Sequence, residues 1–281
     1  MNPLDPVVQG ENTIARRATY KKPPVIERAA TVTAHIPPEV FFARFESWKS
    51  EILKDFPDYD PIQQWLINYT NREEVPVLDE VPPQVRVTHR FWKRNLQNQR
   101  FMSMRVLPNR LTLNLHPEYN DPHRYEELRD ALMRWFPLWV AHFSATEFPQ
   151  VHLDYINLLA AETTPQFVEP KTGAVHIGQA LTVFASGPGK NQGITPPYDC
   201  QMGLAIDRER GSFFRLRILG LDSRPNRGAA VRIDFQAVTD RHDSPLTASE
   251  IRGEVEFLHE VMIEKFEAVF TDAAKISFQS V

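Results

Sequence analysis

The sequence predicts an α+β protein built on mostly antiparallel sheet, and three patterns indicate this class. Several segments alternate apolar and polar residues, as strands do when one face of a sheet is buried and the other meets water. Other segments repeat their apolar residues at helical spacing, which is typical of helices that cover such a sheet. Strands followed by a covering helix occur twice, at 20–160 and at 175–281. We therefore predict two similar halves packed as one compact unit, with a true duplication left open.

The first half begins with a strand that follows two prolines. Residues 1–19 are polar and aperiodic, so we expect them to form a flexible arm. Pro23 and Pro24 exclude a helix and lead into the strand "VIERAATVTAH". Its alternation places Ile26 on the buried face and Glu27 on the other, where Glu27 can pair across strands with one of the arginines of the sheet.

Two helices are predicted next. The stretch "PPEVFFARFESWKSEIL" starts with prolines and carries one apolar helical face. In "DPIQQWLINY" an Asp-Pro helix entry precedes apolar residues at helical spacing, so we expect a second, short helix there.

Three strands, a longer helix and a closing strand complete the first half. "VRVTHRFWK", "RFMSMRVL" and "RLTLNLHP" read as strands, and Pro108 with Asn109 joins the last two in a hairpin. The segment "NDPHRYEELRDALMRWFPLWVAHF" predicts a helix that Pro137 kinks or ends. The strand "VHLDYINLLA" follows it.

The second half contains four predicted strands and the longest helix. The strands are "GQALTVFAS", "DCQMGLAID", "SFFRLRIL" and "AAVRIDFQAV". They are separated by turn-like linkers rich in Gly and Pro. The helix starts after "TASE" at 247–250, which is a capping box, and its apolar residues continue in one stripe.

Composition limits the class of protein. The chain has 281 residues, 42% of them hydrophobic and 24% charged, which is typical of a globular protein with a sizeable core. A formal charge of -4 argues against a basic surface over the whole protein, but it is compatible with a local basic patch. The single cysteine, Cys200, excludes an intrachain disulfide and indicates a reducing compartment. No apolar run is long enough to span a membrane, so we expect a cytoplasmic protein without membrane association.

Two residues are candidates for catalysis. His152 and Asp154 share one face of their predicted strand, because side chains two positions apart point the same way. Together with Tyr155 and Asn157, which alternate to the opposite face, they raise the hypothesis of a phosphoester hydrolase. A hydrogen-bonded pair on a strand is the alternative explanation. The nine histidines form no complete metal-ligand pattern, so we expect no metal and no cofactor.

Arginines on the predicted strands indicate a binding surface. Arginines interleaved with aromatic side chains on a solvent-facing sheet are typical of surfaces for single-stranded nucleic acid or for an acidic partner. Cross-strand pairing with acids such as Asp207, Glu209 and Asp234 is the alternative explanation of the same arginines. The candidate binding residues are Glu27, Arg90, Trp92, Arg105, Tyr155, Asn157, Arg215 and Arg217.

Three stretches together resemble a sporadically distributed prokaryotic protein family of uncharacterised function. They are "YKKPPVIERAATV", then "RLTLNLHPEYNDPHRYEELRDALMRWFP" followed by "VHLDYINLL", and "IDFQAV" followed by "LHEVMIEKFEAVFTDAAKISF". The resemblance covers most of 20–278 and implies a shared fold without a particular activity. The first strand and the 170–200 region depart from the family pattern. The positions that match its motifs are Tyr20, Glu27, Tyr155, Asn157, Asp234 and His259.

These patterns favour a non-enzymatic protein that binds a protein partner. The sequence contains no complete catalytic constellation. The sporadic distribution of the resembled family suggests a partner encoded by a neighbouring gene, as in a defence or toxin–antitoxin cassette. A phosphoester hydrolase and a protein that binds single-stranded nucleic acid through the arginine-bearing sheet are the two alternatives. The sequence predicts no oligomeric state.

Overall fold

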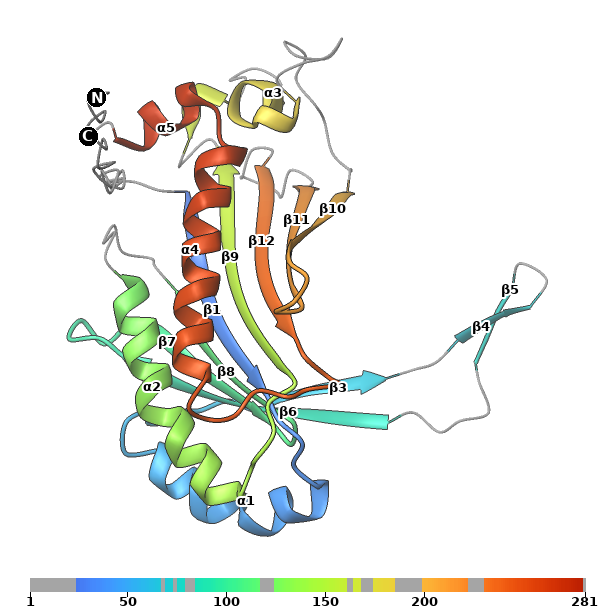
Figure 1. The fold of residues 1–281 in the computed structure, drawn as a ribbon, viewed down its shortest axis with the longest axis vertical. Coiled ribbons are helices and arrows are strands. Elements are labelled where there is room, and N and C mark those ends of the chain that lie inside the picture. The colour runs from blue at the N-terminus through green and yellow to red at the C-terminus, as the bar shows by residue number, and fades with distance from the viewer. Residues whose placement is uncertain are drawn as a thin grey trace, which may run out of the picture.

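A ten-stranded antiparallel sheet forms the centre of the computed structural model (Figure 1). The structure describes residues 24–66, 69–72, 75–78, 84–116, 124–160, 164–167, 174–184, 199–221 and 230–279. The strands of the sheet are β1 (Val25–Thr33), β2 (Asp58–Tyr59), β3 (Ile62–Leu66), β6 (Gln84–Arg94), β7 (Arg100–Leu107), β8 (Arg110–Leu115), β9 (Gln150–Ala160), β10 (Asp199–Asp207), β11 (Ser212–Leu221) and β12 (Ala230–Asp240). A separate hairpin contains β4 (Tyr69–Arg72) and β5 (Val75–Leu78).

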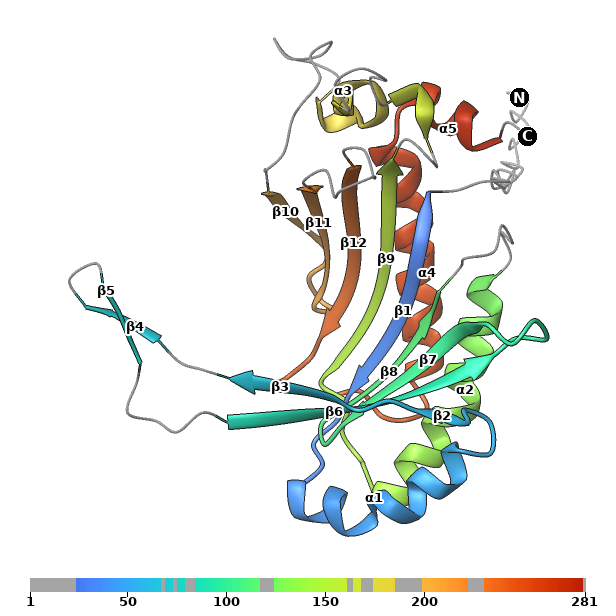
Figure 2. The same cartoon turned by 180° about the vertical axis from the view of Figure 1, so that it is seen from behind.

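Helices cover one face of this sheet, which confirms the predicted α+β class. The helices are α1 (Pro38–Ile52), α2 (Arg124–Phe143), α3 (Ile177–Ala180), α4 (Ile251–Val269) and α5 (Asp272–Gln279). The long helix α4 packs against β9 and β12, α2 packs against β8 and β1, and α1 packs against α2. Seen from behind, the opposite face of the curved sheet carries none of the described helices (Figure 2). We call it the open face, and the other the covered face.

On each side of the central pair β1 and β9, the next three strands outward follow in reverse chain order. The full order is β10-β11-β12-β9-β1-β8-β7-β6-β2, with β3 also paired with β6. Outward from β1 the neighbours are β8, β7 and β6, and outward from β9 they are β12, β11 and β10. Because β9 pairs with β12, the sheet runs without a break through the two predicted halves. The division into two similar halves, and a duplication behind it, stay predictions.

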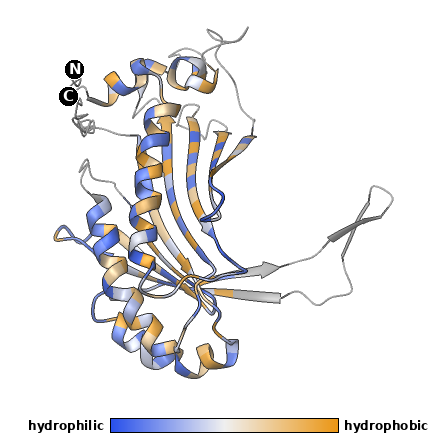
Figure 3. Cartoon of the chain, viewed as in Figure 1, coloured by the Kyte–Doolittle hydropathy of each residue, from blue (hydrophilic) through white to orange (hydrophobic). Residues whose placement is uncertain are grey.

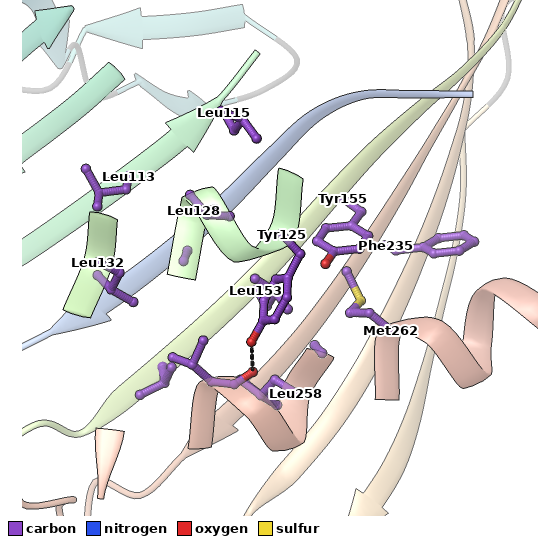
Figure 4. Close-up of a cluster of buried hydrophobic side chains, with 14 of the residues drawn as sticks. Leu113, Leu115, Tyr125, Leu128, Leu132, Leu153, Tyr155, Phe235, Leu258 and Met262 are labelled. Atoms are coloured by element: carbon purple, nitrogen blue, oxygen red, sulfur yellow. Dashed lines mark hydrogen bonds between the residues drawn. The ribbon is translucent and has the colours of Figure 1, made fainter. Parts of the chain in front are cut away.

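Alternation along the strands builds the core between the sheet and the helices. Hydropathy changes at almost every position along the central strands and follows stripes on α4 (Figure 3). In β9 the side chains that face the helices are buried, whereas those between them are half-buried. Figure 4 shows leucines of β8, β9, α2 and α4 meeting in one layer with Phe235 and Met262. The predicted apolar stripes of α1 and α4 are confirmed, since all their members are buried: Phe41, Phe45, Trp48, Ile52, Ile251, Val255, Leu258, Met262, Phe266 and Val269.

The predicted helix in "DPIQQWLINY" is wrong, because the stretch begins with the connection that follows β2 and then forms β3. The backbone N–H of Asp60 donates to the carbonyl of Arg90 at 2.8 Å, and its carboxylate binds the Arg90 side chain. Asp60 is therefore held by β6 rather than by a helix start. Residue 62 pairs with Thr88 as β3 runs along β6. Pairing with a long strand overrides the local helix signal of the Asp-Pro pair.

Two other predictions need correction. The segment "GQALTVFAS" is not a strand: its described part holds most of the short helix α3 and a 3₁₀ turn at Thr182–Phe184, and Leu181 makes one isolated bridge with Phe270. Of the two outcomes predicted for Pro137, a kink or the end of the helix, the end is excluded because α2 continues to Phe143, and the kink stays a prediction. Buried aromatic side chains on both sides of the exposed proline, including Trp135 and Trp139, hold the helix in place.

Ile26 is exposed instead of buried. The pairing of β1 with β9 shifts register between Val25 and Glu27, so the residue between them bulges out of the alternation. Ile26 is 39% exposed as a result. The rest of the strand follows the pattern, and Ala30 and Val32 are buried.

The ends of several elements have clear local causes. At the start of α4, the Glu250 carboxylate accepts hydrogen bonds from the backbone N–H and the hydroxyl of Thr247, both at 2.7 Å. This is the glutamate half of the predicted capping box. Between β10 and β11, Gly211 has φ +68°, which a residue with a side chain adopts only at a cost.

Replacing Gly211 or Gly253 with alanine should change the free energy of unfolding in opposite directions. A Cβ at position 211 would lie 2.3 Å from the carbonyl oxygen of Asp240, whereas one at position 253 meets nothing within 4 Å. Gly211→Ala should lower the free energy of unfolding by at least about 2 kcal/mol. Gly253→Ala in α4 should raise it by about 0.5–1 kcal/mol. Urea unfolding followed by circular dichroism measures both, and a neutral Gly211→Ala would contradict the described turn.

Candidate functional site

The register of the sheet determines which side chains share the open face. Residues directly opposite each other on antiparallel strands point to the same side. One row across the sheet pairs Arg215 with Gln236, Gln236 with Asp154, Asp154 with Ala29, and Ala29 with Asn114. All the residues of this row therefore lie on the open face. Among the candidate residues, this face holds Glu27, Arg90, Trp92, Arg105, His152, Asp154, Arg215 and Arg217.

The open face contains a hollow of about 610 Å³. It extends from β7 to β10 across the central pair of strands. Three acids lie in it beside five arginines. We call it the arginine hollow and define it by Glu27, Arg105, Arg110, Asp154, Arg215, Arg217, Arg232 and Asp234.

On the β7 side of the hollow, Arg105 is held by Glu27. The Arg105 Nη2 donates to Glu27 Oε1 at 3.1 Å, and its Nε donates to Asn114 Oδ1 at 3.1 Å. The Asn114 amide also donates to the same Glu27 oxygen. The predicted pairing of Glu27 with an arginine on a neighbouring part of the sheet is confirmed. This network fixes the position of the Arg105 guanidinium.

On the β10–β12 side, each arginine has a different partner. Arg217 makes a two-point contact with Asp199, at 3.1 Å and 2.6 Å. The Arg232 Nε donates to Asp234 Oδ1 at 2.7 Å. Arg215 reaches the Gln236 oxygen at 3.4 Å and lies 4.7 Å from the centre of the Phe213 ring. Its two contacts are thus with an amide and an aromatic ring, neither of which neutralises its charge.

Asp154 lies between these two groups of arginines. Its Oδ1 accepts a hydrogen bond from Gln236 Nε2 at 2.7 Å. Burial raises the pKa of Asp154 to about 6, and the nearby charges of Asp234 and Glu27 act in the same direction, against the Gln236 bond and the Arg105 charge. Asp154 is thus an acid that changes its charge near neutral pH.

His152 shares the open face but does not form a catalytic pair with Asp154. Its Nε2 meets Gln150 Oε1 at 3.2 Å, while Asp154 is bonded to Gln236. Burial lowers the pKa of His152 to about 4, and the charges of Arg110 and Arg215 contribute to this shift. A neutral imidazole with such a low pKa is a poor general base at neutral pH.

Arg90 and Trp92 lie on the open face beyond the hollow. Arg90 binds the Asp60 carboxylate, and its guanidinium carbon lies 5.1 Å from the Trp92 ring centre. Arg100 approaches the same ring at 5.3 Å. Trp92 is therefore in contact with two guanidinium groups, and the His116 ring centre lies 5.0 Å from its own.

Tyr155 and Asn157 lie on the covered face, away from the other candidates. The Tyr155 hydroxyl hydrogen-bonds to His259 Nδ1 at 2.8 Å, and the His259 ring stacks on Tyr125 at 3.4 Å. Figure 4 places Tyr155 and Tyr125 beside α4 in this layer. Asn157 is fully buried and donates to the carbonyl of Ile233 at 3.2 Å. These contacts tie α2 and α4 to the sheet, which is a structural role.

Sequence reasoning missed three residues of the open face: Arg110, Asn114 and Gln236. All three alternate with buried residues in their strands, as in "RLTLNL" of β8. That alternation is the signal in the sequence that could have identified these three residues. Without the strand order, nothing brings Asn114 next to Glu27 or Gln236 next to Asp154.

Comparison with known proteins adds no family assignment. No family model matches the chain, and a search of curated proteins gives no match. Within the described ranges, no three His, Cys, Asp or Glu side chains gather in a way that could hold a metal ion. Every helix in the same part of the chain is too short or too polar to cross a membrane.

Asp154→Asn tests the burial of this carboxyl. The folded-state pKa of about 6 lies above the 3.8 of an unburied aspartate, so the folded protein loses stability as the pH rises from about 4 to about 6, and the loss is complete above pH 6. Asparagine keeps the acceptor for Gln236 and removes the charge. We expect Asp154→Asn to raise the free energy of unfolding at pH 7.5 by about 1–2 kcal/mol, and to have little effect at pH 4. Chemical unfolding at both pH values measures this, and equal stability at pH 7.5 would contradict the assignment.

Proposed function

We propose that this protein is a non-enzymatic binding protein that recognises an acidic segment of a protein partner in the arginine hollow. The observation that carries the proposal is the concentration of five arginines on the open face of a chain with a formal charge of -4. A protein with net negative charge that gathers arginines on one concave face attracts acidic ligands there and not elsewhere.

The contacts of the hollow support binding more than catalysis. Three arginines are held by acids or an amide, so their donors are positioned before a ligand arrives. Such preorganisation reduces the entropy lost on binding. The hydrolase hypothesis needs His152 and Asp154 to act together, but each is bonded to a different glutamine. We therefore keep binding as the proposed function.

The mixture of charges favours a protein over a nucleic acid. Glu27, Asp154 and Asp234 lie among the arginines, and a chain of phosphates would meet repulsion from them. A peptide can place its acidic side chains opposite arginines and its own donors opposite these acids. Bases also need aromatic faces on which to stack. In the hollow region, Phe213 already has the Arg215 guanidinium over its ring.

The dimensions of the hollow suit an extended segment. Six inter-strand spacings separate β7 from β10, so the hollow crosses roughly 29 Å of sheet. An extended peptide covers that length with about nine residues. The resemblance to a sporadically distributed prokaryotic family leads us to propose the product of a neighbouring gene, within a defence or toxin–antitoxin cassette, as the source of this segment.

Charge reversal at Arg215 tests the proposed surface. Arg215→Glu changes an exposed side chain that contacts an amide and an aromatic ring, so the fold should be kept. Arg252→Glu on α4 makes the same change of charge on the helix side and is the matched control. With a fluorescent Asp/Glu-rich peptide as the probe, we expect Arg215→Glu to weaken binding at least about tenfold and Arg252→Glu to leave it unchanged.

A second arm of the same experiment separates the two classes of ligand. Tight binding of a single-stranded oligonucleotide, with an affinity that falls steeply as salt rises, would replace the protein-partner proposal by the nucleic-acid one. No binding of either probe, or equal losses in both variants, would reject the hollow as a binding surface. A tagged pull-down from the native host then identifies the partner as a protein lost with Arg215→Glu and retained with Arg252→Glu.

A further inference from the structure

In the part of the chain that the structure describes, strand β10 forms one edge of the sheet. Among the described strands only β11 pairs with it. Its first seven residues are exposed, unlike those of any other long strand of the sheet that the structure describes in full. The free N–H and C=O groups of such an edge can form a ladder with another strand.

This edge has few of the features that usually prevent pairing: its two charged residues, Asp199 and Asp207, are its first and last. Proteins protect edge strands with lysine, proline, bulges or short length. The sequence of β10, "DCQMGLAID", contains no lysine, arginine or proline over nine residues, and its register shift occurs only at the far end, between Ala205 and Asp207. The edge is therefore long and regular enough to accept a strand.

An apolar stripe runs along the covered side of β10. Cys200, Met202 and Leu204 pair with Ile218, Leu216 and Phe214, which are all buried on the covered face. Met202 is nevertheless 42% exposed and Leu204 52% exposed. The apolar layer of the core thus continues to the edge strand, where its side chains are exposed. Such exposure is expected where a further strand binds and buries them.

We propose that a second copy of this chain completes it, through antiparallel pairing of the two β10 strands around a two-fold axis at Met202. In this register Met202 lies opposite its own copy and Cys200 lies opposite Leu204, so apolar side chains meet on the covered side. On the open side, Asp199 lies opposite Ala205 and Gln201 opposite Gly203. If the two-fold axis passed through Gly203 instead, Asp199 of each copy would lie opposite Asp207 of the other. Like charges opposite each other destabilise a sheet.

The same pairing has a consequence for the open face. A two-fold axis perpendicular to the sheet keeps both open faces on the same side of the dimer. Gln201 and Gly203 line the arginine hollow, so the two hollows approach each other across the new ladder. The dimer would present two hollows side by side to one ligand or partner, which raises its avidity. The dimer itself does not depend on what the hollow binds.

A cysteine placed at the axis tests the register. Residues directly opposite on antiparallel strands have Cα atoms about 4.5–5.5 Å apart, which a disulfide can span. In the full chain with Cys200→Ser, we expect Met202→Cys to form a covalent dimer under mild oxidation. Leu204→Cys in the same background is the control, since in this register it faces position 200 and should stay monomeric on non-reducing gels. Crosslinking through Leu204→Cys but not Met202→Cys overturns the proposal.

Sedimentation equilibrium tests the dimer without a new cysteine. We expect the wild-type chain to dimerise, and Met202→Lys to raise the dimer Kd at least about tenfold by placing a charge on the apolar stripe. Ile276→Lys, on α5 and 65% exposed, is the matched control and should leave the Kd unchanged. Thermal unfolding confirms that both variants fold. A monomeric wild type, or a dimer equally affected by both variants, overturns the proposal, whereas Arg215→Glu should leave dimerisation intact.

Discussion

The pairing of β1 with β9 is the constraint on which the rest of the structure depends. It joins the first described strand to a strand that begins more than a hundred residues later, with Ala29 opposite Asp154 and Ala30 opposite Leu153. Because side chains alternate, this one register determines the face of every residue on both strands, and the outer strands follow it by pairing in turn. A shift of one residue would send Leu153 to the open face and Asp154 into the core. Burial of the leucine layer under α2 and α4 therefore fixes the position of the acid in the hollow.

The polar residues of the two faces therefore have different roles. On the covered face, Tyr155, His259 and Tyr125 form a buried contact that ties both long helices to the sheet. On the open face, Glu27 and its amide neighbour fix Arg105, and Asp234 fixes Arg232. These pairs contribute little to stability, since they are partly exposed to water. They position guanidinium groups, and positioned guanidinium groups are what an acidic segment needs.

Local pattern was enough to predict much of this arrangement. Alternation in β7, β8, β9, β11 and β12 predicted the strands, and it also separated His152 and Asp154 from Tyr155 and Asn157 correctly. It failed where pairing competed with a local signal: the Asp60–Pro61 pair is typical of a helix start, but β6 holds Asp60 through Arg90. It also failed at Ile26, where a bulge removes one residue from the alternation. The hollow itself could not be predicted, because the order of the strands brings Glu27, Asn114 and Arg105 together from positions far apart in the sequence.

We propose that the open face, fixed by the β1–β9 register, is the surface that binds. The arginine side-chain Nε–H signals in a nitrogen-15 NMR spectrum test it directly, since the chain carries arginines on both faces. On adding the acidic peptide or the identified partner, signals of the hollow should shift or broaden while those of the helix side stay in place. Movement on the helix side with an unchanged hollow would contradict the account. The two groups to compare are Arg105, Arg110, Arg215, Arg217 and Arg232 on the open face, and Arg129, Arg134 and Arg252 on the helices.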